Sequence, residues 1–139
     1  MNTVQSVLCL MASVVVVGAP TLAAEPPACQ DKHIFHRVKE AYQDSLTVRG
    51  QKAKFKNVTL KETGVGATPA LVNQYAPSKD YFNKSRYCDA AVELDNGEKD
   101  QGYVRLDGKK DPNETAFNFD LCTVKFDTFK DGCKDNKKP

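Results

Sequence analysis

The chain has 139 residues, which is room for one domain, and 40% of them are hydrophobic while 27% are charged, as in a soluble globular protein. Lys and Arg number 20 and Asp and Glu 18, so the formal net charge is only +2. Acidic residues interleave with the basic ones throughout, and this pattern argues against a nucleic-acid-binding protein, in which basic side chains cluster.

Residues 1–24 have the layout of a secretory signal peptide. No charged residue occurs between Val7 and Ala24, and the valine run 14–17 is followed by Gly, Pro and small residues. The apolar run is shorter than the about 20 residues of a bilayer span. The segment before it lacks the usual Lys or Arg, and a buried N-terminal strand is the alternative interpretation.

The sequence therefore predicts three parts: a signal peptide over 1–24, a single disulfide-bonded domain over 25–133 and a disordered tail over 134–139. We expect a periplasmic or secreted protein with no stable membrane insertion after removal of the signal.

Four cysteines remain beyond the signal, an even number that predicts two disulfides in an exported chain. Four cysteines allow three pairings, and the spacing favours Cys29 with Cys88 and Cys122 with Cys133. No C-x-x-C motif occurs, so neither a zinc ribbon nor a thioredoxin-like redox pair is indicated.

The first predicted element is a helix over Asp31–Ser45, where apolar residues recur every three or four positions. Gln30 or Asp31 can cap its start, and Gly50 can end it. A strand follows over Lys52–Glu62, with a slip in its alternation near Lys56 that indicates a bulge.

A long loop is predicted over Thr63–Lys79, which is rich in Gly, Pro, Thr and Ser. Three strands then follow, over Arg86–Leu94, Gln101–Leu106 and Thr115–Phe126. The Asn-Gly pair within residues 95–98 is a hairpin signal, and a polar turn is predicted over 107–114.

One N-terminal helix packed on a curved antiparallel sheet of about four strands is an α+β fold, and cystatin-like and NTF2-like folds have this architecture. The bulge near Lys56 agrees with a sheet that wraps around a helix.

The segment Arg86-Tyr-Cys-Asp-Ala-Ala-Val-Glu-Leu-Asp-Asn-Gly97 resembles a group of small uncharacterised exported proteins of Gram-negative bacteria. The similarity continues through Gly102-Tyr-Val104 and through Cys122 to Cys133. This chain departs from the group in lacking tryptophan and in its higher lysine content. The resemblance implies a disulfide-bonded periplasmic α+β domain, and it implies no activity.

His33 and His36 could place two imidazoles one helical turn apart with Asp31, as in a zinc or copper site. The alternative is an exposed first turn of the helix. The pair Asp89 and Glu93 could in principle do acid–base work, but carboxylates at this spacing on a strand usually face solvent.

Lys52, Lys54 and Lys56 alternate and therefore share one strand face, where they could bind an anionic ligand. The alternative is that they protect an edge strand against pairing with other chains. Three asparagines, Asn57, Asn83 and Asn113, also stand in the N-x-Ser/Thr glycosylation pattern, which has meaning only in a eukaryotic secreted protein.

The sequence contains no G-x-S-x-G motif, and its mature cysteines are expected to be paired, so an enzyme is not favoured. We predict an exported binding or interaction module that uses no cofactor and binds an unknown protein or anionic ligand. An inhibitor-like protein is one form of such a module. Two alternatives stay open. One is a small NTF2-like enzyme with a pocket between helix and sheet, lined by Tyr42, Tyr87, Tyr103 and Asp120. The other is a structural envelope component.

Overall fold

A computed structural model describes residues 25–139, and the predicted signal peptide lies outside them. The elements follow in the order α1 (Lys32–Val48), β1 (Phe55–Ala67), η1 (Ala70–Asn73), β2 (Phe82–Leu94), β3 (Lys99–Lys109), β4 (Phe117–Thr123), η2 (Val124–Phe126) and η3 (Lys134–Asn136). The three η elements are short 3₁₀ helices. Among the described residues, no helix combines the length and the apolar character that crossing a membrane requires.

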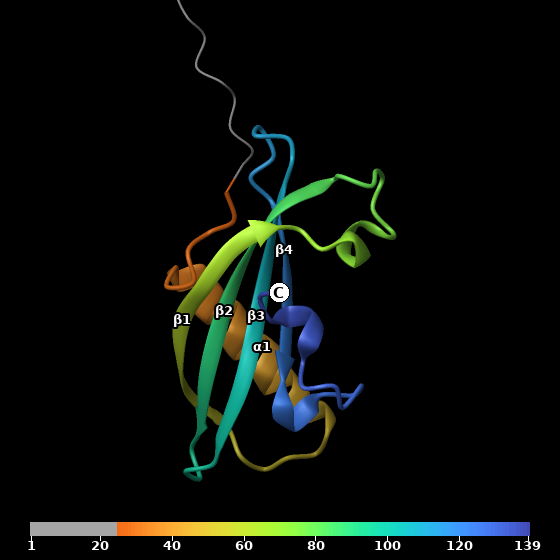
Figure 1. Cartoon of the computed structure of the whole chain (residues 1–139). Coiled ribbons are helices and arrows are strands. Elements are labelled where there is room, and N and C mark those ends of the chain that lie inside the picture. The colour runs from red at the N-terminus through yellow and green to blue at the C-terminus, as the bar shows by residue number, and fades with distance from the viewer. Residues whose placement is uncertain (1–24) are drawn as a thin grey trace, which may run out of the picture.

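The four strands form one open antiparallel sheet in the order β1-β2-β3-β4, and α1 packs across one of its faces (Figure 1). The predicted α+β class is therefore confirmed. The choice between a cystatin-like and an NTF2-like fold stays a prediction.

Helix α1 begins and ends at signals that the sequence contains. Asp31 is the N-cap, and its carboxylate accepts a hydrogen bond of 2.8 Å from the backbone N–H of His33. At the other end Gly50 has φ +66°, and the N–H groups of Gly50 and Gln51 donate to the carbonyls of Thr47 and Leu46. These two bonds form a Schellman motif, whose left-handed residue is most easily a glycine.

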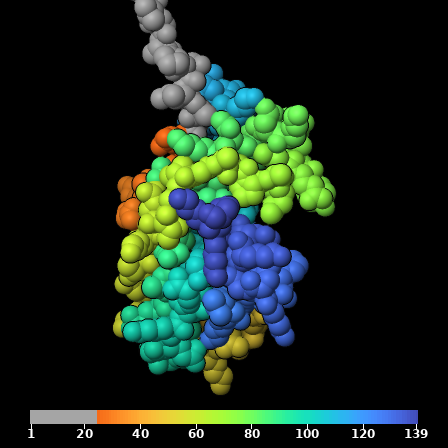
Figure 2. Space-filling view, in the orientation of Figure 1, coloured from red at the N-terminus to blue at the C-terminus, as the bar shows by residue number. Residues whose placement is uncertain are grey.

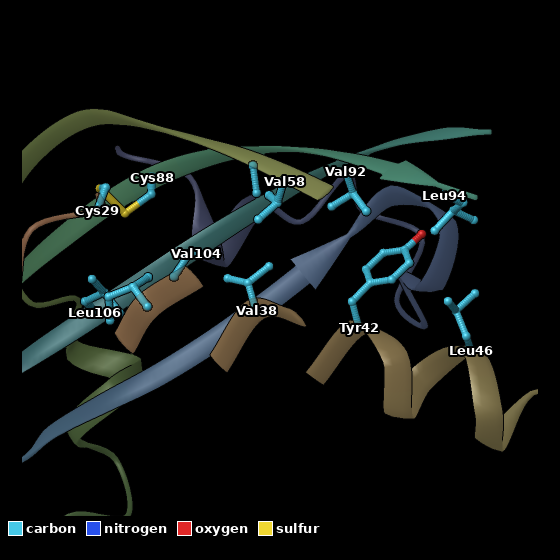
Figure 3. Close-up of a cluster of buried hydrophobic side chains, with 12 residues drawn as sticks. Cys29, Val38, Tyr42, Leu46, Val58, Cys88, Val92, Leu94, Val104 and Leu106 are labelled. Atoms are coloured by element: carbon cyan, nitrogen blue, oxygen red, sulfur yellow. A yellow bond between two sulfur atoms is a disulfide. The ribbon is translucent and has the colours of Figure 1, made fainter. Parts of the chain in front are cut away.

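The core lies between α1 and the sheet and is filled with side chains. Ile34, Val38, Tyr42 and Leu46 recur every four residues along α1 and are all buried. The sheet meets them with alternating residues of its strands, of which the β2 set was predicted: Val58, Cys88, Ala90, Val92, Leu94, Val104 and Leu106. Figure 3 shows this cluster of side chains. Each fully buried aliphatic side chain contributes about 1.5–3 kcal/mol by leaving water.

Strand β1 is longer than predicted. Residues 63–67 were expected to begin a loop, but they continue the strand as far as Ala67, which pairs with Lys84. Two register shifts occur, at Phe55/Asn57, where the bulge was predicted, and at Glu62/Gly64. Gly64 has φ +155°, a conformation that glycine adopts easily, so β1 resumes its pairing with β2 after the second register shift.

The meander was correctly predicted in order, but its strand bounds differ. Strand β2 begins at Phe82 and β3 runs to Lys109, so Asp107, placed by the sequence in a polar turn, lies inside the sheet. Strand β4 is shorter than predicted, because Val124–Phe126 forms η2. The Asn-Gly turn is confirmed, and Gly97 has φ +85°.

The asparagines of the three glycosylation patterns, Asn57, Asn83 and Asn113, are all exposed. The structure thus leaves each of them accessible, and it does not decide between a bacterial and a eukaryotic origin.

Both predicted disulfides are present, Cys29–Cys88 and Cys122–Cys133. The first joins the segment before α1 to the middle of β2 across 59 residues, and the second closes a loop across 11 residues. The first bond therefore holds the helix against the sheet, while the second fixes a local surface loop.

A disulfide removes more conformational entropy from the unfolded chain when it closes a longer loop. We therefore predict that the double variant Cys29→Ala/Cys88→Ala loses about 4 kcal/mol of unfolding free energy, and that Cys122→Ala/Cys133→Ala loses about 3 kcal/mol. Urea unfolding followed by far-UV circular dichroism measures both. Reduction of the unsubstituted protein is the control for the change in side chains. The reverse order of the two losses would contradict the loop-length argument.

Candidate functional site

The face of the sheet turned away from α1 carries a cluster of buried polar side chains. Ser85 and Tyr87 come from β2, and Arg105 and Asp107 from β3, each alternating with residues of the apolar core. Asp107 is 0% and Arg105 4% exposed. Charged side chains are rarely buried to this degree unless they are paired, so their partners decide whether the arrangement is stable.

Arg105 and Asp107 form a hydrogen-bonded ion pair. The Nε of Arg105 lies 3.1 and 3.2 Å from the two carboxylate oxygens of Asp107. Ser85 donates to Oδ1 of Asp107 at 2.5 Å, and Asn118 of β4 donates to Oδ2 at 2.8 Å. The carboxylate is thus compensated on both oxygens by groups from three strands.

The outer nitrogens of Arg105 reach the C-terminal part of the chain and β4. Nη1 donates to the backbone carbonyl of Asp135 at 2.6 Å, and Nη2 lies 3.5 Å from the carboxylate of Asp120. The guanidinium therefore links the interior of the sheet to the segment that crosses it.

Tyr87 extends this cluster with a hydroxyl that is buried and lacks a hydrogen-bond partner among the described residues. Burial raises the pKa of the Tyr87 hydroxyl above its usual value, the positive charge of Arg105 opposes this shift, and the carboxylate of Asp107 adds to it. The phenol therefore stays neutral at physiological pH.

The C-terminal segment packs on this same face, although residues 134–139 were predicted to be disordered. It contains η3, and the buried Asn136 donates to the carbonyls of Tyr103 and Asp120 at 3.3 and 3.1 Å. The ammonium of Lys137 lies 4.6 Å from the centre of the Tyr103 ring, which is a cation–π distance. The segment up to Lys137 is thus held by specific contacts.

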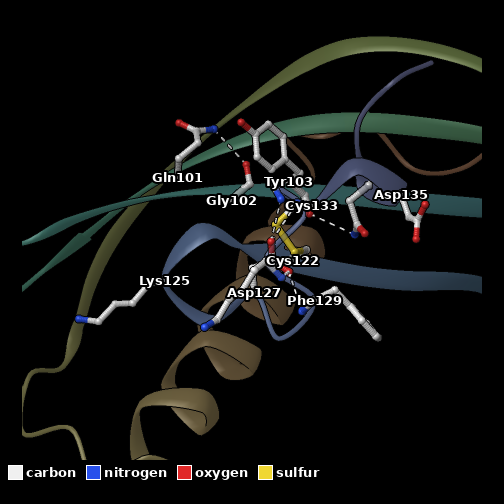
Figure 4. Close-up of a disulfide and its surroundings, with 12 residues drawn as sticks. Gln101, Gly102, Tyr103, Cys122, Lys125, Asp127, Phe129, Cys133 and Asp135 are labelled. Carbon is white, nitrogen blue, oxygen red and sulfur yellow. Dashed lines mark hydrogen bonds between the residues drawn. A yellow bond between two sulfur atoms is a disulfide. The ribbon is translucent and has the colours of Figure 1, made fainter.

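The loop closed by Cys122–Cys133 is organised around the carboxylate of Asp127 (Figure 4). Its Oδ1 accepts from the N–H groups of Phe129 and Lys130, and its Oδ2 accepts from those of Gly132 and Cys133, at 2.9–3.2 Å. Burial opposes ionisation of Asp127, but the four backbone hydrogen bonds outweigh it and lower the pKa of this carboxyl below its usual value.

A cleft of about 290 Å³ opens beside this loop. Its walls come from the second half of α1, the end of β4, the disulfide loop, the C-terminal segment and η1. In Figure 2 the segment around η1 overhangs the C-terminal part of the chain on one side of the molecule. The lining residues include Tyr42, Ser45, Arg49, Leu71, Arg105, Asp120, Leu121, Cys122, Thr123, Phe126, Asp127, Phe129, Asp131, Asp135 and Asn136.

Carboxylates outnumber the cations that line this cleft. Asp120, Asp131 and Asp135 stand on its wall in addition to Asp127, which already binds four N–H groups. Arg105 is shared between Asp107 and Asp120, and Asp131 lies 3.9 Å from Lys134. The guanidinium of Arg49 lies 4.9 Å from the centre of the Phe126 ring. The cleft therefore combines an acidic wall with apolar surface from Leu71, Leu121, Phe126 and Phe129.

The two histidines lie at the exposed start of α1, as the simpler interpretation expected. The Nε2 of His36 is 3.0 Å from Glu40, and Asp31 caps the helix. The described residues contain one group of three potential metal ligands, Cys122, Asp127 and Cys133, and it does not include a histidine. Since both sulfurs form the disulfide, this group has no thiolate to offer a metal.

Lys52, Lys54 and Lys56 are exposed, but only Lys56 lies in the edge strand β1, which begins at Phe55 and shifts register at Phe55/Asn57, so the three lysines do not share one strand face as predicted. Lys56 pairs with Glu93 at 3.2 Å, so one charge of the predicted strip is compensated. Glu93, which was considered for acid–base work, therefore forms an ion pair. The position of Lys56 on an edge strand agrees with the alternative that the lysines prevent pairing with other chains.

Of the four residues expected to line an enzyme pocket, Tyr42 and Asp120 both line the cleft, whereas Tyr87 and Tyr103 do not. Tyr42 lies in the core, where its hydroxyl donates to Asp100 at 2.9 Å; burial and this hydrogen bond raise the pKa of Tyr42. Tyr87, Tyr103 and Asp120 belong to the opposite side of the sheet. The helix–sheet interface itself is filled.

The buried cluster of Arg105 and Asp107 was not predicted from the sequence. Their alternation with Val104 and Leu106 was the available signal, because it places both on one strand face. Two buried charges on the outer face of a sheet imply that another segment covers that face. The sequence alone does not say which segment.

Comparison with known proteins finds no matching family model, no matching curated protein and no matching solved structure.

Removing one member of the buried ion pair leaves the other without its compensating charge. We therefore predict that Arg105→Met and Asp107→Leu each lower the unfolding free energy by about 3–5 kcal/mol, and that the double variant loses much less than the sum. Urea unfolding provides the measurement. As a control, Lys56→Met removes the exposed pair with Glu93 and costs at most about 1 kcal/mol. If Arg105→Met lowered the unfolding free energy as little as Lys56→Met does, the prediction would be wrong.

The lowered pKa of Asp127 makes the disulfide loop sensitive to acid. The folded pKa lies below the unfolded value of about 3.9, so the stabilisation is complete above that value and is lost as the pH falls through the folded pKa. Wild type and Asp127→Asn should differ in Tm by a constant amount from about pH 7 to pH 5, and this difference should shrink below about pH 4. A Tm difference that does not change down to pH 2 would show that ionised Asp127 contributes nothing.

Proposed function

We propose that this chain is an exported binding module whose ligand occupies the cleft between η1, β4 and the disulfide loop. The observation that carries this proposal is the location of the open space. Buried apolar side chains occupy the helix–sheet interior, while the cleft opens beside it and combines buried residues such as Tyr42 and Thr123 with exposed ones such as Leu71 and Phe129. A surface cleft with apolar and charged walls suits recognition of a partner.

The segment that overhangs the cleft is anchored at its base and exposed at its tip. Asn73 exchanges two hydrogen bonds of 2.9 Å with the backbone of Phe82. Beyond this anchor, Leu71 is 48% and Tyr75 92% exposed. A loop held in this way loses little conformational entropy when it binds, and an exposed tyrosine is a residue type that dominates many interfaces.

The disulfide loop on the opposite wall of the cleft is also held in place and also exposes an apolar side chain. The Cys122–Cys133 bond and the hydrogen bonds to Asp127 fix the loop, and Phe129 at its surface is 86% exposed. Two fixed loops with exposed apolar side chains therefore face one cleft. An inhibitor of an extracellular hydrolase is one form that such a module can take.

Export is supported by the two disulfides, which persist in oxidising compartments, and by the signal-peptide pattern of residues 1–24. The resemblance to exported proteins of Gram-negative bacteria points to the periplasm as the compartment.

The test is site-specific photo-crosslinking in the native envelope fraction. A benzoylphenylalanine replaces Phe129, which lines the cleft, or Tyr75, which is exposed on the segment that overhangs it, and the exposed Asn96 in the β2–β3 turn serves as a matched control. We expect one adduct shared by positions 129 and 75 and absent from position 96. The same adducts at all three positions, or none at any, would refute the cleft as the binding site.

A further inference from the structure

The sheet has two edges that differ in how they are protected. An edge strand directs the N–H and C=O groups of every second residue away from its neighbour, where another chain can bind them. The described part of the chain pairs β1 only with β2, and β4 only with β3. Both edges are therefore potential sites of strand addition.

The β1 edge carries two features that discourage such pairing. Lys56 and Lys61 place charge along the strand, and two register shifts distort it. The β4 edge has no register shift, and Asp120 is its one charged residue. Its sequence, Phe-Asn-Phe-Asp-Leu-Cys-Thr, contains no Lys, Arg or Pro, and its register with β3 is unbroken from Phe117 to Thr123.

The cleft runs along the end of this unprotected edge. Four consecutive β4 residues, Asp120 to Thr123, line it, so a chain lying in the cleft lies beside the backbone of β4. Thr123 is 4% exposed, and its hydroxyl has no hydrogen-bond partner among the described residues. This part of the cleft wall therefore contains an unpaired polar group.

We propose that an extended peptide with basic side chains adds to β4 as a fifth strand. This inference rests on the proposed function and specifies its ligand. The peptide backbone binds the open edge of β4, and its side chains alternate between the two sides of the sheet. One set meets apolar Leu121 and Phe126, and the other meets the carboxylates of Asp120 and Asp135.

The charge of the cleft favours a basic peptide over a second copy of this chain. Four aspartates, Asp120, Asp127, Asp131 and Asp135, line the cleft against two cations, Arg49 and Arg105. Asp120 shares Arg105 with the buried Asp107, and Asp131 lies 3.9 Å from Lys134, so the lining keeps an excess of negative charge but not three free carboxylates. Pairing of β4 with β4 of another copy would bring two such acidic walls together, and like charges on opposing strands repel. Lysine or arginine side chains reverse the sign of that interaction.

Synthetic peptides test this on the oxidised mature domain, residues 25–139. The probe is blocked Thr-Lys-Val-Lys-Val-Lys-Thr, in which all lysines share one strand face. We expect it to bind by isothermal titration calorimetry and to slow amide hydrogen exchange in β4 but not in β1. The same peptide with Glu for Lys should bind at least about 10-fold more weakly, because its charge matches that of the cleft.

Backbone methylation separates strand addition from attraction between charges alone. One peptide is N-methylated at its lysines and another at its valines, and only one set of amides can face β4. We expect one methylated peptide to lose at least about 10-fold in affinity while the other does not, because only one set donates to the edge. Equal binding of both methylated peptides and the parent would overturn the proposal.

Asp120→Asn tests the acidic wall, with the exposed Asp44→Asn on α1 as its matched control. We expect Asp120→Asn to weaken the lysine peptide by about 3- to 10-fold and Asp44→Asn to leave it unchanged, since only Asp120 lines the cleft. Thermal melts verify that both variants fold. Equal affinities for the two variants would remove the acidic wall from the proposal.

The two proposals fail in different ways. If positions 129 and 75 crosslink a partner but no peptide binds β4, the cleft is a binding site for another kind of ligand, and the strand-addition proposal is wrong. Concentration-dependent dimerisation in sedimentation that is abolished by the peptide would instead assign the edge to a second copy, which also overturns the choice of a basic peptide.

Discussion

The buried pair of Arg105 and Asp107 fixes the side of the molecule on which the cleft lies. In a medium of low dielectric constant both charges must be satisfied by neighbouring groups. Those groups come from β2, β4 and the C-terminal segment, through Ser85, Asn118 and the carbonyl of Asp135. The pair therefore determines where segments far apart in the chain lie relative to one another.

Because the buried pair needs polar partners, the two faces of the sheet are covered by different kinds of side chain. Helix α1 covers one face with apolar side chains, and the C-terminal segment contacts the other through polar and charged ones. A sheet with both faces contacted in this way offers its edges for interaction. Since β1 carries lysines and register shifts, β4 is the edge whose backbone remains suited to a partner.

The covalent framework and the electrostatics act together at this edge. The Cys122–Cys133 bond closes the loop, and Asp127 organises its backbone by accepting four N–H groups. Asp127 is thereby satisfied within the loop, while Asp120 shares Arg105 with Asp107 and Asp131 lies 3.9 Å from Lys134. A rigid wall with an excess of negative charge favours ligands of opposite sign over those of like sign.

The sequence by itself determined the features that depend on local spacing: the capped helix beginning after Asp31, the alternation of β2 and the Asn96-Gly97 turn. It favoured one of three cysteine pairings, which the structure shows. Capping, alternation and turn formation act between residues only a few positions apart. Tertiary structure alone decided the extension of β1 to Ala67, the burial of Asp107 and the docking of the C-terminal segment around Asn136. Each of these depends on a partner distant in the chain, because a strand lengthens only where another strand pairs with it and a charge is buried only where other segments compensate it.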